Sequence, residues 1–327
     1  MAKPWKVRRL DPEKPFETGL KLVLRSRVKE VFSYGAKAVK KNEPDAVHDM
    51  RVSARRLKAV LTIFDQYFMK KAIGKHRSRL QTLLRALGDV RDTDIFIEFL
   101  LEYKRSATER MNPDALERVI ELERNKRGAY RTDLKHTLAR LRDARFKQHF
   151  RKFLSDTLSS SLARARASGC SFRDMGRRVA PTLLDAFCAH AKDVTAHPDS
   201  TKRLHKMRID GKRVRYGMEQ FTDAFSAQYE QCLEEVKRLL DVMGSIHDCD
   251  VNLPRLMRRI RAVGDHTHSG GTDAALAGAL RALKERRSAL FETMRQTLEC
   301  WQREDFRTVL VRSMESAADA HTRMDDQ

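Results

Sequence analysis

The sequence lacks the features that mark several common protein classes. No apolar run approaches the roughly 20 residues that a membrane-spanning helix needs, so we expect no membrane span. The five cysteines are scattered, odd in number and never spaced as C-x-x-C, which argues against a zinc ribbon and against a disulfide scaffold. We therefore expect reduced thiols, no metal site and no cofactor.

The N-terminus lacks the apolar segment of a secretory signal. The stretch "MAKPWKVRRLDPEKPF" is basic but has no apolar centre, so we expect a cytoplasmic protein. Lys6, Arg8 and Arg9 fall in this stretch, and we predict that residues 1–15 form a basic arm that is mobile.

Acidic and aromatic residues are also scarce. The chain of 327 residues has 45 acidic residues against 66 Lys and Arg, which gives a formal charge of +21. This surplus predicts an anionic partner, and nucleic acid, an anionic membrane and another polyanion all qualify. Aromatic residues make up only 7% and no helix-turn-helix signature occurs, which argues against base stacking and groove reading. Binding to a nucleic-acid phosphate backbone stays open as an alternative.

Few residues interrupt a helical pattern. Only 14 Gly and 8 Pro occur, no segment alternates as a strand would, and nearly every segment has helical spacing. We therefore predict an all-α fold of helical bundles. The expected helices cover residues 16–42, 45–69, 72–88, 92–106, 113–142 and 146–164, then 172–195, 200–223, 227–244, 248–263, 272–298 and 302–320. Residues 264–273 are expected to form a flexible loop that exposes His266 and His268.

Two leucine-rich segments end in a glycine, Gly88 in one and Gly244 in the other. We expect each glycine to end a helix, as glycines at helix C-termini do. The aspartates that follow are expected to cap the next helix, with the anchoring of an arginine as a second role. These aspartates are Asp92 and Asp94, then Asp248 and Asp250.

Two sequence blocks occur twice in the same order. The first is "VHDMRVSARRLKAVLTIF" from Val47 and "LHKMRIDGKRVRYGMEQF" from Leu204. The second is "LLRALGDVRDTDI" from Leu83 and "LLDVMGSIHDCDV" from Leu239. Two matches at near-equal separation predict an internal duplication of roughly 155 residues. We place the halves at residues 16–165 and 166–327.

The first block of each copy carries a cationic stripe. On a helix that turns about 100° per residue, its cations gather on one side and its apolar residues on the other. The cationic side holds His48, Arg51, Arg55 and Lys58 in the first copy, and His205, Arg208, Lys212 and Arg215 in the second. Like charges four residues apart repel by a few tenths of a kcal/mol, and a solvated face would mix the signs. A bound anion therefore explains the stripe better than exposure to solvent does.

These blocks resemble the CHAD domain, the conserved histidine α-helical domain. The pattern V/L-H-x-M-R, then R/K-R-x-K/R and an aromatic residue, followed by L-G-x-x-R/H-D-x-D, occurs in both copies, and the resemblance spans residues 16–320. It implies one domain of two pseudo-symmetric helical bundles around a basic central cavity that binds inorganic polyphosphate, in proteins associated with polyphosphate granules. By match to the motif, the cavity residues would be His48, Arg51, Arg55, Arg56, Lys58, His205, Arg208, Lys212, Arg213 and Arg215. The second copy departs from the pattern at Gly211, where the first has Ala54, and in M-G for L-G.

Some members of that family carry an N-terminal triphosphate-tunnel domain. Here the helical region begins almost at once, so we expect that catalytic domain to be missing. Polyphosphate itself suits a surface of Arg and Lys, because it offers phosphate oxygens and no bases to read. Other polyanions are further candidates, and a membrane partner is not expected. His48 and His205 are either phosphate donors or structural histidines that orient a neighbour.

Two His-Asp dipeptides, which begin at His48 and His247, raise a third hypothesis, a metal-dependent phosphohydrolase. The duplication repeats neither of them: Lys206 follows His205, and Arg91 stands at the place of His247. A metal site needs deprotonated ligands that converge, and a cationic setting opposes a second cation. We therefore expect binding without catalysis, and no catalytic residue.

Overall fold

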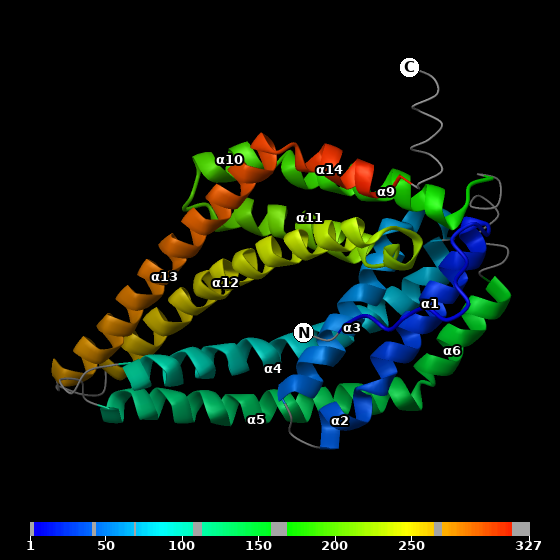
Figure 1. Ribbon diagram of the computed structural model, residues 1–327. Helices are drawn as coiled ribbons and strands as arrows, with labels where there is room; N and C mark the ends of the chain where they lie inside the picture. Colours follow the sequence, from blue (N-terminus) through cyan, green and yellow to red (C-terminus); the bar gives the residue numbers. More distant parts are fainter. Residues whose placement is uncertain are drawn as a thin grey trace.

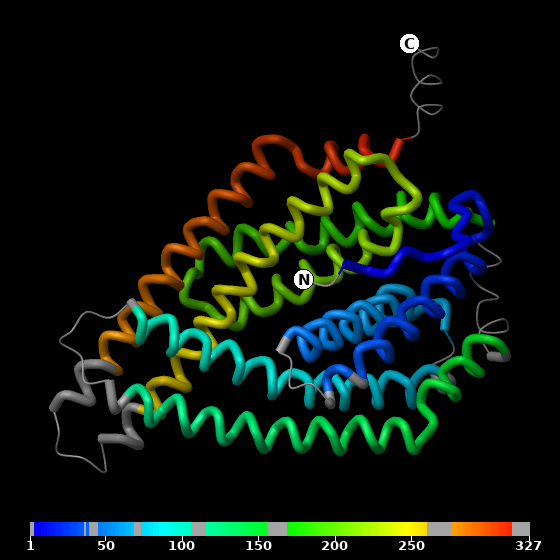
Figure 2. Tube along the Cα trace, turned by 60° about the horizontal axis from the view of Figure 1, so that its bottom comes forward, coloured from blue at the N-terminus to red at the C-terminus, as the bar shows by residue number. Residues whose placement is uncertain are grey.

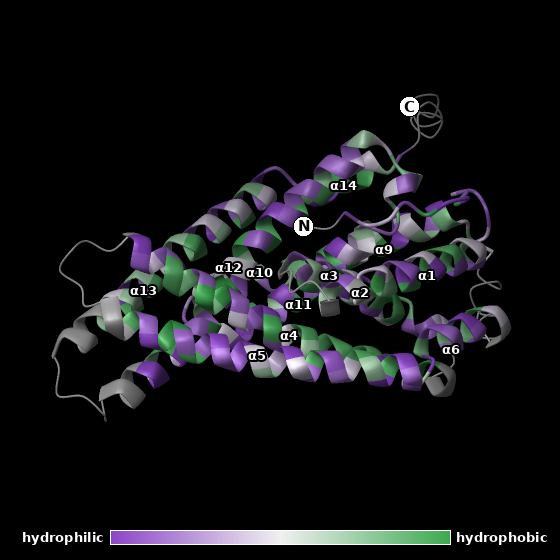
Figure 3. Ribbon diagram, turned by 90° about the horizontal axis from the view of Figure 1, so that it is seen from below, coloured by the Kyte–Doolittle hydropathy of each residue, from purple (hydrophilic) through white to green (hydrophobic). Residues whose placement is uncertain are grey.

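The computed structural model describes residues 3–40, 44–68, 70–106, 113–157, 169–264 and 270–315. Within these ranges there is no β-strand, and extended pairing is limited to an isolated bridge between Pro15 and Ser171. The predicted all-α fold is confirmed. No helix in this part of the chain is long and apolar enough to cross a membrane, and hydrophilic residues occur along all the long helices in Figure 3.

Two series of helices follow one another along the chain in the same order (Figure 1). The first series is α1 (Phe16–Ser33), α2 (Gly35–Lys40), α3 (Pro44–Ile63), the 3-10 turn η1 (Asp65–Tyr67), α4 (Lys70–Ser106), α5 (Pro113–Asp143) and α6 (Phe146–Lys152), which the π turn η2 (Phe153–Thr157) extends. The second is α9 (Phe172–Cys188), α10 (Ala191–Ala196), α11 (Thr201–Met218), the 3-10 turn η3 (Thr222–Ala224), α12 (Ala227–Gly264), α13 (Gly270–Arg303) and α14 (Phe306–Ser313). A duplication requires this agreement in order, and the duplication itself stays an inference from the sequence.

One large apolar core holds the two series together. At its centre the rings of Phe16 and Phe172 have centroids 6.2 Å apart, and those of Phe64 and Phe221 are 6.3 Å apart. Each pair joins residues at matched places in the two series, at the start of α1 and α9 and just after α3 and α11. The core is therefore shared between the series rather than divided into one core for each.

A second, smaller core joins the far ends of the two long helix pairs. α4 lies beside α5 and α12 beside α13, and the two pairs converge at one end of the molecule (Figures 1 and 2). Phe96 and Ile120 from the first pair pack there with Leu256 and Leu283 from the second. Glu123 of α5, which is fully buried, accepts hydrogen bonds from Arg255 and Arg259 of α12. The two series are thus tied together at both ends of their contact.

The long helices α4 and α12 correct the prediction that Gly88 and Gly244 end helices. Each helix runs through its glycine without a break, so the predicted segments 72–88 and 92–106 form one helix, as do 227–244 and 248–263. A glycine inside a helix costs about 1 kcal/mol relative to alanine, which the packing of the second core can offset. The four aspartates after the glycines consequently lie inside helices and do not cap them.

Two predicted helices are divided in the structure. The segment 16–42 separates into α1 and α2 at Tyr34, and 172–195 separates into α9 and α10 near His190. The start of α9 is fixed by a capping box, because Asp174 N donates to Ser171 Oγ at 3.0 Å while Ser171 N donates to Asp174 Oδ2 at 3.2 Å. His266 and His268, and most of the predicted loop 264–273, lie outside the described residues.

The N-terminal arm is packed against the body of the protein, and the prediction of a mobile tail is wrong for residues 3–15. Phe172 N donates to Lys14 O at 2.9 Å, and Arg27 Nη2 donates to Trp5 O at 3.1 Å. Val7 is buried in the large core. The arm therefore links α1 to the start of α9, and Figure 2 shows it lying along the helices.

Gly211 marks the closest approach of α11 to its neighbours. A Cβ atom there would lie 2.5 Å from Leu240 Cδ2 and 3.0 Å from Phe187 Cε2. Both distances are shorter than Cβ atoms normally keep, so a side chain here would require Leu240 and Phe187 to move, and this packing accounts for the departure from the family pattern at this residue.

Candidate anion-binding site

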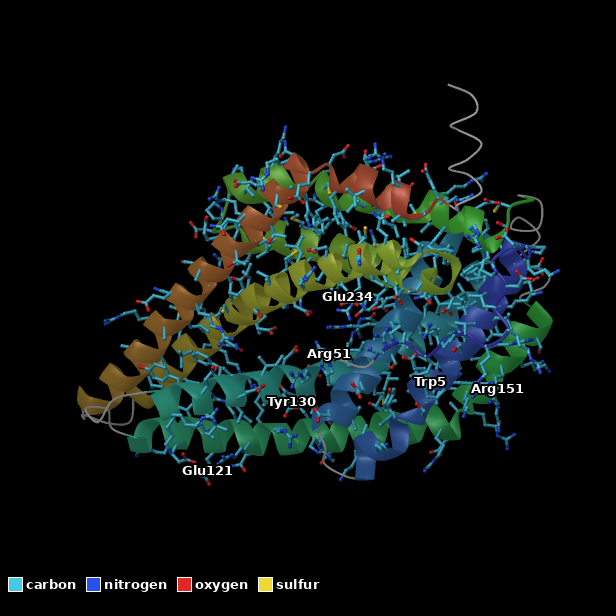
Figure 4. The ribbon with its side chains drawn as sticks, viewed as in Figure 1. Trp5, Arg51, Glu121, Tyr130, Arg151 and Glu234 are labelled. Atoms are coloured by element: carbon cyan, nitrogen blue, oxygen red, sulfur yellow. The ribbon has the colours of Figure 1, made fainter. Side chains whose placement is uncertain are left out.

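The cationic stripes of α3 and α11 meet where these two helices are in contact. The positive charges of Arg51 on α3 and Arg208 on α11 both act on Arg55. We call the group that they belong to the cationic cluster. Its members, each subject to the charge of others in the group, are His48, Arg51, Arg55 and Arg91 from the first series and His205, Arg208, Lys212 and His247 from the second. Figure 4 shows Arg51 in the middle of the molecule, between α4 and α12.

Few carboxylates balance these charges. Arg51 Nη1 lies 2.9 Å from Asp92 Oδ1, and Asp248 lies close enough to Arg208 to act on its charge. Within the described residues, no carboxylate forms an ion pair with Arg55, Arg208 or Lys212. The Nε atom of Arg51 is buried and has no hydrogen-bond partner there. A buried donor without a partner costs about 1–3 kcal/mol, so an oxygen anion at this place would remove a real penalty.

The pKa values report the same crowding of positive charge. Burial, and then the charges of Arg208, Arg55 and Arg51, lowers the pKa of Lys212 to about 6. Burial and neighbouring cations also lower the pKa of His247 to about 3 and that of His48 to about 4. The imidazoles of these two histidines are therefore neutral near pH 7, and each can donate one hydrogen bond without adding charge.

Two glycines leave space beside the cluster. A Cβ atom on Gly88 of α4 would lie 3.8 Å from Arg51 Nη2, and one on Gly244 of α12 would meet no atom within 4 Å. Packing therefore does not require either glycine, although each sits inside a helix at a cost of about 1 kcal/mol. A cavity of about 440 Å³ borders the cluster between α4 and α12, lined in part by Arg91 and Asp248. The predicted central cavity stays a prediction.

Four of the predicted site residues lie elsewhere or are already engaged. Arg56 is 1% exposed and pairs with Glu30 at 3.0 Å and with Glu219 at 2.7 Å, so it belongs to the buried interior rather than to the cluster. Arg213, its matched residue, is exposed and pairs with Asp210 at 2.7 Å. On a helix of about 100° per residue, both stand about 80° from the stripe histidine on the side opposite to the other stripe cations, which turns their side chains away from the stripe.

Arg215 and Lys58 occupy the edge of the stripe. Arg215 is buried, and its Nε donates to Glu219 Oε1 at 3.0 Å, so this predicted site residue serves the interior too. Lys58 is exposed and donates to Gln81 Oε1 at 2.6 Å. It lies at the edge of the cationic cluster, close enough to Arg55 for the two positive charges to interact. The structure therefore brings together six of the predicted residues, which are His48, Arg51, Arg55, His205, Arg208 and Lys212.

Arg91 and His247 belong to the cluster although the motif did not assign them to it. The two residues stand at matched places in the second repeated block, three residues after the glycine. His247 has its ring centroid 5.5 Å from that of His205 and is acted on by Arg208 and Lys212. An alignment of the two copies that accepted Arg and His as equivalent donors would have found both residues.

The second aspartate after each glycine has a shared structural role. Asp94 pairs with Arg127 of α5, and Asp250 pairs with Arg287 of α13 at 2.6 Å. Each ion pair joins the two long helices of its own series, so the pairs stiffen equivalent helix hairpins. Asp92, in contrast, turns to the stripe and pairs with Arg51, as its predicted second role requires.

The surroundings of His247 bear on the metal hypothesis. Its imidazole faces the cations Arg208 and Lys212. In the part of the chain that the structure describes, no group of three or more His, Cys, Asp or Glu residues is placed to hold a metal ion. What the cluster can do chemically is bind an extended anion, since guanidinium and ammonium groups from both series converge on it.

Comparisons with known proteins give a family model, described as CHAD domain, that matches residues 23–257. Uncharacterized proteins from two Mycobacterium tuberculosis strains, CDC 1551 / Oshkosh and ATCC 25618 / H37Rv, are 26% identical over 274 residues, which is 80% of this chain. The match covers 48% of each relative, so this chain spans about half of their length.

Two solved structures are similar in fold. The crystal structure of the CHAD domain from the plant Ricinus communis has a TM-score of 0.66 at 18% identity, covering 91% of this chain and 96% of the other. PptA from Streptomyces chartreusis has a TM-score of 0.59 at 16% identity, covering 88% of this chain and 100% of the other. At these identities the likeness concerns the fold alone.

Proposed function

The chain belongs to the CHAD domain family, and we propose that it binds inorganic polyphosphate in its cationic cluster and catalyses no reaction. The observation that carries the proposal is that Arg55, Arg208 and Lys212, drawn from both series, converge without an ion-paired carboxylate among the residues that the structure describes. Such an arrangement is costly in the free protein. A linear anion with about one charge per phosphate would relieve the repulsion along its whole length.

Arginine and lysine are suited to this ligand in different ways. The planar guanidinium of Arg51 or Arg208 can meet two phosphate oxygens at once, and the ammonium of Lys212 acts as a compact point charge. Neutral His48 and His247 can add hydrogen bonds to oxygens without further repulsion. A long chain should engage more of these groups than tripolyphosphate or orthophosphate can.

Binding to the phosphate backbone of a nucleic acid is the second candidate. The unpaired cations favour it as much as they favour polyphosphate. Base stacking does not support it, because Tyr216, the aromatic residue beside Arg55, is only 6% exposed and offers no platform. The proposal therefore expects preference for a ligand that lacks bases.

Titration calorimetry with long-chain polyphosphate, tripolyphosphate, orthophosphate, DNA and RNA at two salt concentrations tests the proposal. We expect long-chain polyphosphate to bind most tightly, and its affinity to fall steeply with salt as counterions are released, by analogy with nucleic acids. DNA or RNA that binds as tightly as polyphosphate at equal charge would favour the second candidate. Equal affinity for tripolyphosphate and long chains would exclude an extended site.

The absence of catalysis is part of the proposal and has its own test. We expect no phosphate release from polyphosphate or nucleotides in the presence of Mg²⁺, Mn²⁺ or Zn²⁺. Release that needs a metal and disappears in a His247→Ala variant would restore the phosphohydrolase hypothesis. A cytoplasmic location at polyphosphate granules follows from the same proposal, and colocalisation of a fluorescent fusion with stained granules would test it.

A further inference from the structure

An apolar groove with a cationic rim lies on the first series, away from the cationic cluster. It has a volume of about 560 Å³ and is formed by the end of α1, the last turns of α5 and the start of α6. Its floor consists of Phe32, Leu138, Leu141 and Phe146. Its rim carries Lys135, Arg142, Arg145 and Lys147, and no acidic residue lines it.

The second series shows what this place looks like when it is filled. Arg145 and Asp305 have the same left-handed backbone, with φ of 46°, directly before α6 and α14, which fixes the alignment of the two series here. Four residues before them stand Leu141 and Trp301. Trp301 stacks on Phe306 with centroids 4.1 Å apart at 10°, and its edge meets Phe187 at 6.2 Å. A tryptophan thus packs between α14 and α9 where the first series has the smaller Leu141. The cavity of about 570 Å³ that Trp301 also borders is lined by α12, α13 and α14, and no residue of α9 lines it.

The charges differ between the series in the same way. In the second series, Arg295 pairs with Glu292 at 2.6 Å and Arg307 pairs with Asp185 at 2.7 Å, so the cations are neutralised within the chain. Their counterparts in the first series are Lys135 and Lys147, and Asp305 is replaced by Arg145. Arg142 of the rim lies 3.5 Å from the exposed Asp143, and within the described residues no carboxylate forms an ion pair with Lys135, Arg145 or Lys147. Three of the four rim cations in the first series are therefore without an ion-paired carboxylate in the part of the chain that the structure describes, whereas Arg295 and Arg307 in the second series have one.

We propose that this groove is a docking site for an acidic amphipathic segment of a partner protein, which lays an apolar side chain on Phe32 and Leu138 and carboxylates against Lys135, Arg145 and Lys147. Charge complementarity selects acidic residues, and the partly exposed apolar floor selects an apolar anchor. Polyphosphate would bind the cations of the rim and leave the apolar floor exposed to water. An uncharged apolar ligand would cover the floor and leave the rim unpaired.

A fluorescein-labelled synthetic helical peptide tests the proposal, with Leu and Phe on one face and Glu on the other. Fluorescence anisotropy is measured on the full chain with this peptide, with a scrambled peptide of the same composition, and with a version in which Gln replaces Glu. We expect the acidic amphipathic peptide to bind and the other two to bind at least about tenfold more weakly. We also expect binding to persist in saturating polyphosphate, because the groove is separate from the cationic cluster.

Two variants and one control locate the binding. Leu141→Trp introduces the residue of the second series, and Lys147→Glu reverses one rim charge; each should weaken peptide binding about tenfold and leave polyphosphate binding unchanged. Circular dichroism melts should be unchanged for Lys147→Glu, because Lys147 is exposed. Leu141 is buried, so a lower melting temperature is expected for Leu141→Trp, and its binding is measured well below that temperature. Lys192→Glu on α10, an exposed residue of the second series, makes the same charge change elsewhere and should have no effect.

Several results would overturn the docking site. They are absence of binding by the acidic amphipathic peptide, equal binding of the scrambled peptide, and binding that Lys147→Glu leaves intact. Equal binding of the Gln version would instead indicate an apolar ligand. A dimer in sedimentation equilibrium that Leu141→Trp dissociates would identify a second copy of the chain as the occupant.

Discussion

Arg51 Nη1 and Asp92 Oδ1 lie 2.9 Å apart and join α3 to α4. The two residues come from the two repeated sequence blocks of one series, and in the other series Asp248 acts on Arg208 in the corresponding place. Each series thus sets one carboxylate beside its stripe arginine. Since a bound anion would compete with these carboxylates for the same guanidinium groups, they act as built-in counterions of the free protein.

This relationship makes a prediction about Asp92→Asn. Removal of the carboxylate charge, with almost no change in shape, should raise the affinity for polyphosphate by several-fold, since Arg51 no longer has to leave a counterion. The free protein should lose slightly in stability, because the repulsion in the cluster grows. Calorimetry and thermal melts measure the two effects. Asp65→Asn, which removes the partner of Arg77 outside the cluster, is the control. A fall in affinity for Asp92→Asn would mean that the carboxylate positions Arg51 for the ligand.

Charge reversal within the cluster should weaken binding without unfolding the protein. Arg51→Glu and Arg208→Glu are each expected to lower the affinity for polyphosphate by about tenfold or more, which corresponds to about 1.4 kcal/mol or more. Arg213→Glu has the same change of charge on α11, but Arg213 is exposed and paired with Asp210, so it should change affinity far less. Calorimetry with a defined short polyphosphate also gives the stoichiometry. One site that either reversal weakens is expected, and two independent sites would contradict a shared cluster.

The all-α fold and the faces of α3 and α11 could be predicted because they depend on periodicity alone. The local sequence around an arginine does not show which residue of another helix will form an ion pair with it. Arg56 and Arg213 match in the repeat, yet one is buried and the other exposed, because Glu30 and Glu219 surround Arg56 and have no acidic counterparts in the repeat. Such carboxylates come from other helices, and only the fold brings them to the arginine.

The helix boundaries failed for a related reason. Gly88 and Gly244 each follow a leucine-rich segment, as a glycine at a helix end does. Tertiary packing before and after each glycine nevertheless keeps α4 and α12 continuous. Arg91 and His247 were missed as cluster members because the two copies have different residues at this position. A motif that counts only identical residues does not recognise that Arg and His can both donate hydrogen bonds. Both errors concern the second repeated block. The residues of this block are determined by contacts with neighbouring helices, which the sequence of the block alone does not show.

Glu219 should be among the residues most sensitive to substitution. Glu219 directly follows the last residue of α11, and it is buried. Its carboxylate accepts hydrogen bonds from Arg56 at 2.7 Å and from Arg215 at 3.0 Å. Glu219→Gln leaves two buried guanidinium groups poorly compensated, and breaking a buried pair costs about 3–5 kcal/mol. Urea unfolding measures this loss. Glu234→Gln, which breaks an exposed pair with Lys237, is the control and should change stability little.

Gly244→Ala separates stability from binding. Because a Cβ atom at this position meets no atom within 4 Å, the substitution should stabilise the free protein by about 1 kcal/mol through helix propensity. It also places a methyl group one turn from His247 and Asp248, so the affinity for polyphosphate should fall if the ligand occupies that space. Thermal melts and calorimetry on the same protein measure both. A more stable protein with unchanged affinity would show that the ligand does not reach Gly244.

Binding should strengthen as the pH falls from about 9 to about 6, and Lys212 should be responsible. Its pKa in the free protein is about 6, against an ordinary value of 10.5. The groups that face it are Arg208, Arg55, Arg51, Asp248, His205 and His247. Over this range Lys212 is neutral in most free molecules, whereas a polyanion binds better to its charged form. Binding therefore takes up a proton, and affinity rises as protons become more available, then levels off below pH 6.

The effect of pH on folding stability has the opposite sign to its effect on binding affinity. The unfolded chain binds the Lys212 proton below pH 10.5 and the folded free protein only below about pH 6, so between these values the unfolded state holds more protons and stability rises with pH. The pKa values of His48 and His247, about 4 and about 3, keep both imidazoles neutral across this window. Burial, and then Arg208 and Lys212, lowers the pKa of His205 below its ordinary value of 6.5, which leaves Lys212 as the main titrating group of the cluster. Calorimetry in buffers of different ionisation enthalpy measures the proton uptake. Lys212→Met should abolish most of the uptake and the pH slope, whereas Lys192→Met, an exposed lysine elsewhere, should leave both unchanged. An unaltered slope in Lys212→Met would assign the proton to another group and contradict the role given to Lys212.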